Sequence, residues 1–302
     1  MDKSTKTILV TGSTGVQGGA VARGLLAAGW RVRALTRSTT KPAAVALAAA
    51  GAEVVAGDMD DRSSLAAAMQ GVYGVYSVQA AAGSDVPDDF SWRDEAERGI
   101  SVAEVAAEQG VEAFVYSSAY GTNSPNDMPI LRAKRAIEHR IRDLALPATV
   151  IRPTTFMENF VHPLVGLRKG GTWSTVLRPD TRLQLTAAAD IAAFVTVAFD
   201  RRDELNGKSI TIAGDDLTPP QIAETISRAV GRDVQYLQVP IDVMRLDQGD
   251  DAADGFEWLN LREGGSADIP ALRELHPGLR NLQDWLNAGG ADRIRAYLDG
   301  LG

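Results

Sequence analysis

The segment Thr7 to Gly19, with the sequence TILVTGSTGVQGG, limits the possible folds more than any other part of the chain. It begins with an apolar run typical of a short strand, continues through a glycine-rich turn, and ends in an Ala-rich stretch typical of a helix. Gly12, Gly15 and Gly18 have the spacing G-x-x-G-x-x-G. Such glycines let backbone N–H groups and a helix N-terminus approach a diphosphate closely. The segment predicts a dinucleotide site, although an ordinary strand-to-helix turn has the same spacing.

Apolar strands and helical stretches alternate through the first half of the chain. Strands are predicted at 8–10, 32–36, 53–56, 74–78, 113–118 and 148–152, and helices at 42–50, 62–69, 91–109 and 130–144. This alternation predicts an α/β fold, a doubly wound parallel sheet with helices on both faces. The carboxyl ends of its strands then share one edge, where ligands bind.

The regular alternation of strands and helices ends after Pro153. Further strands are predicted at 182–185, 208–213 and 234–239, with helices running from near Asp190 and over 219–230. We expect a nucleotide-binding domain at 1–155, with a return segment at about 183–207. A smaller mixed α/β region at 156–182 and 208–302 is expected to cover the cofactor cleft and bind a substrate or partner.

Composition narrows the class of protein. The net charge is −8 over 302 residues, which argues against direct nucleic-acid binding. The chain has no cysteine, so disulfides and thiol catalysis are excluded. Neither a signal peptide nor an apolar run of about 20 residues occurs, so we expect a cytoplasmic protein without a membrane span. No histidine pair has metal-ligand spacing, and the acidic run from Asp247 to Asp254 lacks the ligand order of a calcium loop, so no metal site is predicted.

The residues after the second predicted strand bear on the choice of cofactor. Arg37 and Lys41 follow it, and no Asp or Glu occurs between this strand and Glu53. A carboxylate here would bind the ribose 2′-hydroxyl of NAD, whereas cations suit the 2′-phosphate of NADP. The pattern favours NADP(H) over NAD(H), the alternative being two surface cations before a helix.

Two further strand ends face the same ligand in this fold. Asp58 and Met59 follow the third strand, where the adenine is expected, although helix capping also explains an aspartate there. Gln79 and Ala80 follow the fourth strand and are expected to line the adenosine or the nicotinamide ribose.

Several motifs together resemble the NmrA-like family of atypical short-chain dehydrogenase/reductases. They are TGSTGVQGGAVARGLLAAG, TRS with Lys41, GDMDD, VYSSA and IRPTTFMENF, and the resemblance covers about residues 5 to 240. It implies a Rossmann fold that prefers NADP(H). Members of that family include reductases of quinones and phenolic compounds, cofactor sensors with little or no catalysis, and a regulator that binds a repressor.

The resemblance also implies roles for individual residues. The turn that binds the diphosphate would comprise Gly12, Thr14, Gly15, Val16, Gln17 and Gly18. Arg37 and Lys41 would bind the 2′-phosphate, and Asp58 and Met59 would lie beside the adenine. The nicotinamide end of the cofactor would contact Ser117, Ser118, Lys134, Pro153, Thr155 and Phe156, and Asn159 follows on the same segment as Phe156.

One departure from the wider superfamily concerns catalysis. Its usual dyad is Tyr-x-x-x-Lys, in which the lysine holds the nicotinamide ribose and lowers the pKa of the tyrosine. Here Lys134 has Ile130 four residues earlier, and an isoleucine exchanges no proton. Lys134 and Tyr120 are the remaining catalytic candidates, against the alternatives of a solvated lysine and a packing tyrosine.

The substrate candidates are Tyr120, Asn159, His162 and Trp173, although core packing is the simpler explanation for Trp173. Two functions stay open. One is an NADPH-dependent reductase that transfers hydride directly to a quinone, enone or similar conjugated molecule. The other is an NADP(H) redox sensor, weak or inactive in catalysis, that acts through a regulatory protein partner. The sequence does not indicate the oligomeric state.

Overall fold

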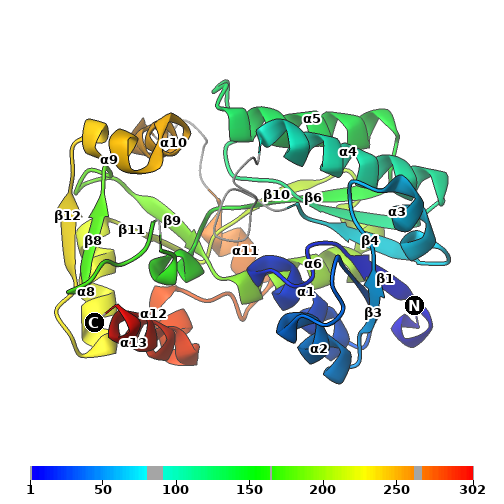
Figure 1. Cartoon of the computed structure of the whole chain (residues 1–302), viewed down its shortest axis with the longest axis horizontal. Coiled ribbons are helices and arrows are strands. Elements are labelled where there is room, and N and C mark those ends of the chain that lie inside the picture. The colour runs from blue at the N-terminus through cyan, green and yellow to red at the C-terminus, as the bar shows by residue number, and fades with distance from the viewer. Residues whose placement is uncertain (1, 80–90, 164, 262–266, 302) are drawn as a thin grey trace. The chain divides into compact units, whose positions relative to one another are not determined.

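A computed structural model describes residues 2–79, 91–163, 165–261 and 267–301 of the chain (Figure 1). The chain divides into two compact units. The first, here called the sheet unit, comprises Met1–Thr122, Ile130–Arg152 and Ala188–Ile210. The second unit comprises Asn123–Pro129, Pro153–Ala187 and Thr211–Gly302.

The sheet unit is built on a sheet with the strand order β10-β6-β5-β4-β1-β2-β3. Its strands are β1 (Thr7–Val10), β2 (Arg31–Thr36), β3 (Glu53–Ala56), β4 (Gly74–Ser77), β5 (Ala113–Ser117), β6 (Ala148–Pro153) and β10 (Ser209–Ile212), whose last residues belong to the second unit. The pairings that join β3, β2, β1, β4, β5 and β6 are all parallel. The chain order reverses between β1 and β4, and ligands of open α/β sheets bind at the carboxyl edge of the strands at such a reversal.

Helices cover both faces of this sheet (Figure 1). On one face lie α3 (Arg62–Met69), α4 (Trp92–Glu108) and α5 (Pro129–Asp143), and on the other α1 (Val16–Ala27), α2 (Pro42–Ala49) and α6 (Ala188–Asp200). The short elements η1 (Lys3–Thr5) and α7 (Arg202–Leu205) complete the unit. Apolar side chains of α3, α4 and α5 form one buried core with alternate residues of the strands, among them Leu65, Val102, Phe114 and Ile137.

Local sequence signals explain where the helices begin. Asp61 accepts hydrogen bonds from the N–H groups of Ser63 and Ser64 and so caps α3. Ser91 and Asp94 form a reciprocal capping box at the start of α4. Each cap satisfies N–H groups that the first turn of a helix leaves without a partner.

The second unit has a three-stranded sheet, β11-β9-β7, and a parallel two-stranded sheet, β12-β8. Its strands are β7 (Thr155–Phe156), β8 (Thr172–Thr175), β9 (Leu183–Thr186), β11 (Asp215–Leu217) and β12 (Gln235–Gln238); its helices are η2 (Met157–Val161), α8 (Pro219–Val230), α9 (Ile241–Gln248), α10 (Asp250–Leu261), α11 (Ile269–Leu275), α12 (Leu282–Trp285), η3 (Leu286–Gly290) and α13 (Ala291–Gly300). Its core gathers Phe160, Trp173, Leu185, Ile226 and Trp285.

The predicted fold class is confirmed, and the strands and helices of the first half begin and end within two residues of their expected positions. In the second unit the sequence missed the short strands β7, β8 and β11. Within the described residues, no helix is long and apolar enough to cross a membrane.

Candidate functional site

The glycine turn lies between β1 and α1 and is held by side chains on both sides. Thr11 Oγ1 donates to the carbonyl of Val78 at 2.8 Å, and Ser13 Oγ donates to the carbonyl of Leu35 at 2.7 Å. Gly12 has a φ of +56°, which favours glycine. A Cβ on Gly18 would lie 2.2 Å from the carbonyl oxygen of Gly12, so only glycine fits there. The turn is therefore fixed to β2 and β4 in a shape that other residues would break.

The N-terminus of α1 carries free donors. The cap residue Gly15 provides no side-chain hydrogen bond, and the N–H groups of Val16, Gln17 and Gly18 donate to no group in the described part of the chain. Val16 is 60% exposed, so this end of the helix is open to a ligand. Free N–H groups at a helix N-terminus form an anion site, which fits the predicted diphosphate turn.

The side chain of Gln17 points back into the sheet unit. Its Nε2 donates to the hydroxyl of Tyr76 at 2.7 Å and to Ser117 Oγ. Gln17 thus ties the first turn of α1 to the carboxyl ends of β4 and β5. It reaches the predicted site residue Ser117, and its own backbone N–H stays available to a ligand.

Arg37 and Lys41 follow β2 and are both exposed. The side chain of neither residue forms an ion pair or hydrogen bond with any residue that the structure describes. Arg98 of the same unit, by contrast, donates two hydrogen bonds of 2.8 Å to Asp60. The two cations after β2 therefore keep their charge for an external anion.

The ends of β3 and β4 place the next predicted residues. Asp58 Oδ1 accepts from the N–H of Asp60 at 3.2 Å, so this carboxylate stabilises the turn before α3, and Met59 packs against the adjacent core. Gln79 is buried, and its Nε2 donates to Ser77 Oγ at 2.9 Å. Among the described residues, nothing donates to Gln79 Oε1. Ala80 lies outside the described residues.

Lys134 is a buried cation paired with a carboxylate that the sequence analysis did not consider. Its Nζ lies 2.5 Å from Glu95 Oε1, and the two side chains are 6% and 0% exposed. The contact is an ion pair by distance but not a well-angled hydrogen bond, because neither oxygen of Glu95 accepts a hydrogen bond within the described structure. Apart from this contact, the ammonium of Lys134 donates to no described residue. Ile130 lies one turn earlier, at the start of α5.

A close approach of α4 and α5 makes this pair possible. Gly99 follows Glu95 by one turn of α4, and a Cβ there would lie 2.3 Å from Ile137 Cδ1 on α5. Without that side chain the two helices pack closely, and Glu95 reaches Lys134. Tyr116 of β5 lies beneath them, with its ring centroid 5.8 Å from Lys134 Nζ. Burial, and then the charges of Glu95 and Glu138, raise the pKa of Tyr116 well above its ordinary value, so its phenol is neutral.

Glu138 organises the loop after β5. Its carboxylate accepts from Ser118 Oγ at 2.6 Å, Thr122 Oγ1 at 3.0 Å and Arg152 at 2.6 and 3.1 Å. Burial would raise the pKa of Glu138, but these hydrogen bonds and the charge of Arg152 outweigh burial and lower it. The network fixes the chain on both sides of Tyr120, at Ser118 and Thr122, and the Tyr120 side chain is half-buried.

The remaining predicted residues belong to the second unit and are described within it. Pro153 ends β6, Thr155 and Phe156 form β7, and Asn159 lies in η2, where its carbonyl accepts from the N–H of His162. Burial lowers the pKa of His162. Trp173 is 4% exposed and packs edge-on against Phe160 at 5.4 Å between ring centroids, so its ring belongs to the core of this unit.

A comparison with known families identifies the chain. The model of the NmrA-like family matches residues 4–253. The chain belongs to the NmrA-like family.

Its similar relatives include reductases. It is 32% identical over 240 residues to the (4-alkanoyl-5-oxo-2,5-dihydrofuran-3-yl)methyl phosphate reductase of Streptomyces griseus, covering 79% of each chain. It is 28% identical over 235 residues to the NAD(P)H azoreductase of Xenophilus azovorans, covering 78% of each.

Solved structures agree on the fold. NmrA, a negative transcriptional regulator solved in complex with NAD, superposes with a TM-score of 0.80 at 23% identity, over 99% of both chains. A complex of NmrA with NADP gives a TM-score of 0.78 at 23% identity, over 97% of this chain and 98% of that one. Both likenesses show that this NmrA-like chain shares the fold of that regulator.

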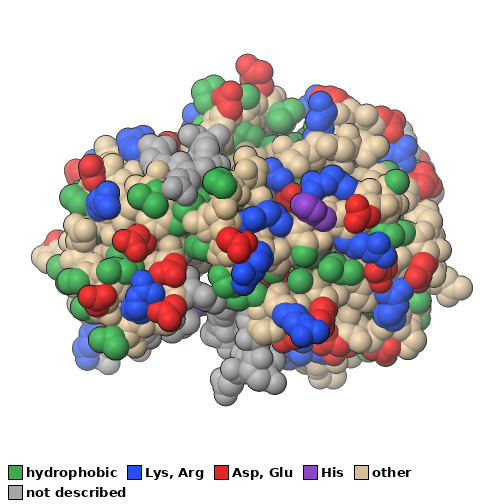
Figure 2. Space-filling model, turned by 90° about the horizontal axis from the view of Figure 1, so that it is seen from above, with side chains coloured by type: hydrophobic (Ala, Val, Ile, Leu, Met, Phe, Trp, Pro, Cys, Tyr) green, Lys and Arg blue, Asp and Glu red, His purple; other side chains and the backbone are tan. Residues whose placement is uncertain are grey.

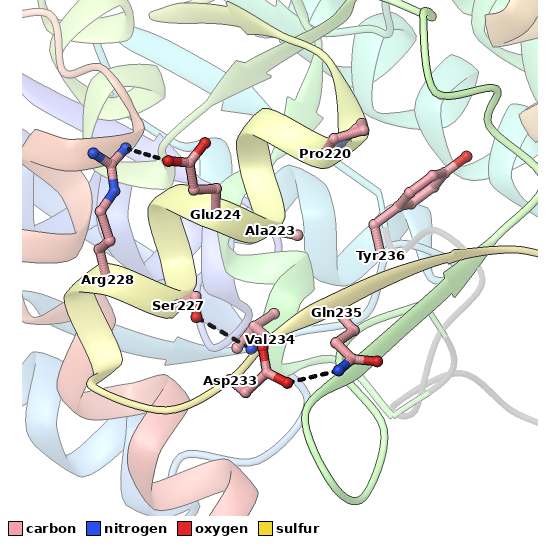
Figure 3. A pocket seen from close by; sticks show the side chains of 9 residues that line it. All are labelled: Pro220, Ala223, Glu224, Ser227, Arg228, Asp233, Val234, Gln235 and Tyr236. Atoms are coloured by element: carbon pink, nitrogen blue, oxygen red, sulfur yellow. Dashed lines mark hydrogen bonds and ion pairs between the residues drawn. The ribbon is translucent and has the colours of Figure 1, made fainter.

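This NmrA-like chain has an open groove of about 500 Å³ in its second unit, between α8 and β12 (Figure 3). Its lining contains none of the predicted site residues. Polar groups of the groove pair with one another: Gln235 Nε2 donates to Asp233 Oδ2 at 2.6 Å, and Arg228 lies 4.0 Å from Glu224 (Figure 3). The groove therefore offers few free polar groups to a ligand.

The surface over α4 and α5 mixes basic and acidic side chains (Figure 2). Arg62 pairs with Glu104 and Glu108, and Arg140 pairs with Glu104, so charges there cancel locally. Within the described ranges, no group of three or more His, Cys, Asp or Glu side chains is arranged to hold a metal ion.

Sequence reasoning missed Glu95, Glu138 and Arg152, although a signal for the two glutamates was present. In α4, Glu95 lies on the same helical stripe as Gly99, Val102 and Ala106, all of which are buried. In α5, Lys134 and Glu138 share a stripe with the buried residues Leu131 and Ile141. A charge within an apolar stripe needs a partner when it is buried, and that rule would have singled out these residues.

Proposed function

We propose that this NmrA-like protein is an NADPH-dependent reductase of a quinone, an enone or a similar conjugated small molecule. The observation that carries the proposal is Lys134, a buried cation whose ammonium pairs with Glu95 and donates no other hydrogen bond to a described residue. An ammonium has three N–H donors, so pairing with one carboxylate leaves donors for which a ligand can supply an acceptor. A ribose hydroxyl of the nicotinamide half would supply it.

The preference for NADPH rests on the two cations after β2. Arg37 and Lys41 are exposed and lack carboxylate partners in the described structure. A guanidinium binds phosphate through paired hydrogen bonds, and Lys41 adds a second positive charge. The free N–H groups at the start of α1 would bind the diphosphate, and the acceptor Gln79 Oε1 suits a ribose hydroxyl.

The residues present favour a substrate that needs little acid catalysis. The bound cofactor supplies a hydride from C4 of the nicotinamide. When hydride adds to a quinone or enone, the negative charge is delocalised on oxygen, and one proton from Tyr120 or water completes the reduction. Ile130 stands where a stronger proton donor would be expected, so a simple ketone is a poorer substrate.

One relative supports this substrate class. The furan named in the Streptomyces griseus reductase carries oxo and alkanoyl groups on an unsaturated ring, which is a conjugated carbonyl compound. At 32% identity over most of both chains, that chemistry is a reasonable guide to this chain. Asn159 and His162 are our proposed substrate contacts; the core position of Trp173 favours packing for that residue.

The test is NADPH oxidation measured with a panel of quinones, enones and simple ketones. We expect turnover with conjugated substrates, loss of turnover in Lys134→Met, and a preference for NADPH over NADH. The same turnover in Lys134→Met as in wild type would contradict the role of Lys134. Calorimetry on Gly15→Trp checks the glycine turn, because the indole would occupy the diphosphate site, and unchanged affinity would refute it.

A second function is favoured by Ile130 and by the likeness to a negative transcriptional regulator. In that case the chain senses NADP(H) and passes the signal to a protein partner. The same panel separates the two. Tight NADPH binding with no turnover on any substrate, together with a partner retained only with one redox form of the cofactor, supports the sensor.

A further inference from the structure

Glu95 is a buried carboxylate that the proposed function does not use. It lies in the first turn of α4 and is fully buried, with Lys134 Nζ 2.5 Å from Oε1. A buried carboxylate usually collects several hydrogen bonds, as Glu138 does. Glu95 accepts none from the described residues. Its contribution is therefore its negative charge beside Lys134.

The other groups around Lys134 do not supply that charge. Tyr116, from β5, has a raised pKa and is neutral. Glu138, one turn along α5, is engaged by Arg152 with two hydrogen bonds. Among the described residues, Glu95 is the carboxylate that neutralises Lys134.

Neutralisation by charge alone leaves the ammonium able to donate elsewhere. The ion pair holds Nζ at the junction of α4, α5 and β5, yet apart from that pair no N–H group of Lys134 donates to a described residue. Without Glu95, a buried cation would be costly and would move toward water. With Glu95, the ammonium is fixed in place and its remaining donors are unused.

We propose that Glu95 is a positioning residue for Lys134. It holds the ammonium beside the carboxyl end of β5, where the unused N–H groups bind a hydroxyl of the nicotinamide ribose. This inference rests on the ribose role of Lys134 in the proposed function. Because Glu95 acts through Lys134, it affects only the nicotinamide half of the cofactor.

The experiment measures binding by calorimetry with two probes, NADPH and adenosine 2′,5′-bisphosphate, a fragment that lacks the nicotinamide ribose. The variants are Glu95→Gln, Lys134→Met and the double variant, with Glu97→Gln as control. Glu97 is an exposed glutamate on the same helix, paired with Arg93. All three substitutions preserve side-chain size approximately, so gross packing is maintained.

We expect Glu95→Gln to weaken NADPH about tenfold or more, the value of a charge-assisted hydrogen bond. It should leave the adenosine bisphosphate unchanged. Lys134→Met should weaken NADPH at least as much, and adding Glu95→Gln to it should cause no further loss. Glu97→Gln should bind both probes as wild type does.

Three results would overturn the inference. In the first, Glu95→Gln weakens both probes equally, which indicates a structural role in the whole site. In the second, Glu95→Gln weakens NADPH just as much in the Lys134→Met background, which shows that it acts independently. In the third, Glu95→Gln binds NADPH like wild type while Lys134→Met does not. That result refutes the positioning role of Glu95 but does not contradict the proposed function. NADPH binding that is unchanged in Lys134→Met refutes the ribose role itself.

Discussion

The sheet unit carries two cation sites built in opposite ways. Arg37 and Lys41 are exposed after β2 and lack a carboxylate partner in the described structure. Lys134 is buried between α4 and α5 and lies 2.5 Å from Glu95. Water stabilises the first pair, so their charges need no partner. The second is removed from water, so the protein must supply the opposite charge.

This difference has a consequence for ligand binding. An exposed cation binds a phosphate through the ligand's own charge, and salt weakens that attraction. A buried, neutralised cation presents hydrogen-bond donors to a neutral group such as a ribose hydroxyl. Under the proposed function, the two sites would bind the two ends of one NADP(H) molecule. The predictions below test the two sites, and the groups beside the buried one, by stability, salt dependence, pH and cofactor affinity.

The largest expected difference is in stability. Lys134→Met leaves Glu95 buried without its counter-charge, which should lower the free energy of unfolding by about 3–5 kcal/mol. Arg37→Met removes an unpartnered surface charge and should change it by less than about 0.5 kcal/mol. Urea unfolding followed by circular dichroism measures both. Equal losses in the two variants would remove the distinction between the sites.

Adding Glu95→Gln to Lys134→Met checks the cause of that loss. Replacing both partners removes the unpaired charge, so much of the stability should return. A double variant as unstable as Lys134→Met would show that the loss comes from side-chain packing.

Sequence reasoning named both residues of the exposed cation pair but only Lys134 of the buried ion pair, for a physical reason. Arg37 and Lys41 are recognised by their place after a strand, which local sequence specifies. The Lys134 site depends on Glu95, which is distant in sequence and approaches only because Gly99 lets α4 and α5 pack closely. No local pattern specifies which helices meet.

The same contrast holds for the fold. The parallel sheet follows from alternating strands and helices, each with its own period, and so the sequence predicted it. The strands β7, β8 and β11 are two to four residues long and pair with segments distant in the chain. Such short strands are specified by their partners rather than by their own residues.

The next prediction concerns cofactor choice at the exposed site. Arg37→Glu reverses the charge expected beside the 2′-phosphate and should weaken NADPH by about 10- to 100-fold, the range of a charge-assisted hydrogen bond. NADH, which lacks that phosphate, should bind as well as before or better. Calorimetry at two salt concentrations measures the change. The NADPH affinity of wild type should fall with salt, and a retained NADPH preference in Arg37→Glu would refute the assignment.

A third prediction concerns Glu138, whose carboxylate accepts several hydrogen bonds. The pKa of Glu138 is lowered in the folded protein, so its stabilising effect is complete above about pH 4.5, the ordinary pKa of glutamate, and is lost as the pH falls through the lower folded value. Glu138→Gln should cost about 1–3 kcal/mol at neutral pH, and the difference from wild type should shrink in acid. Unfolding measured from pH 7 to pH 3 checks this. A difference that stays constant with pH would contradict the role of the charge.

The smallest expected effect is at Tyr116, between the two glutamates. Its hydroxyl has no hydrogen-bond partner among the described residues, and burial, with the nearby charges of Glu95 and Glu138, raises its pKa and keeps the phenol protonated. Removing an unsatisfied buried hydroxyl costs no hydrogen bond, so Tyr116→Phe should change the free energy of unfolding by less than about 0.5 kcal/mol, or stabilise the protein slightly. Thermal unfolding and NADPH affinity are the measurements. A large loss of affinity would mean that the hydroxyl serves the buried cation site, and Glu95 would then share the positioning of Lys134 with Tyr116. An unchanged affinity leaves that site to the ion pair alone.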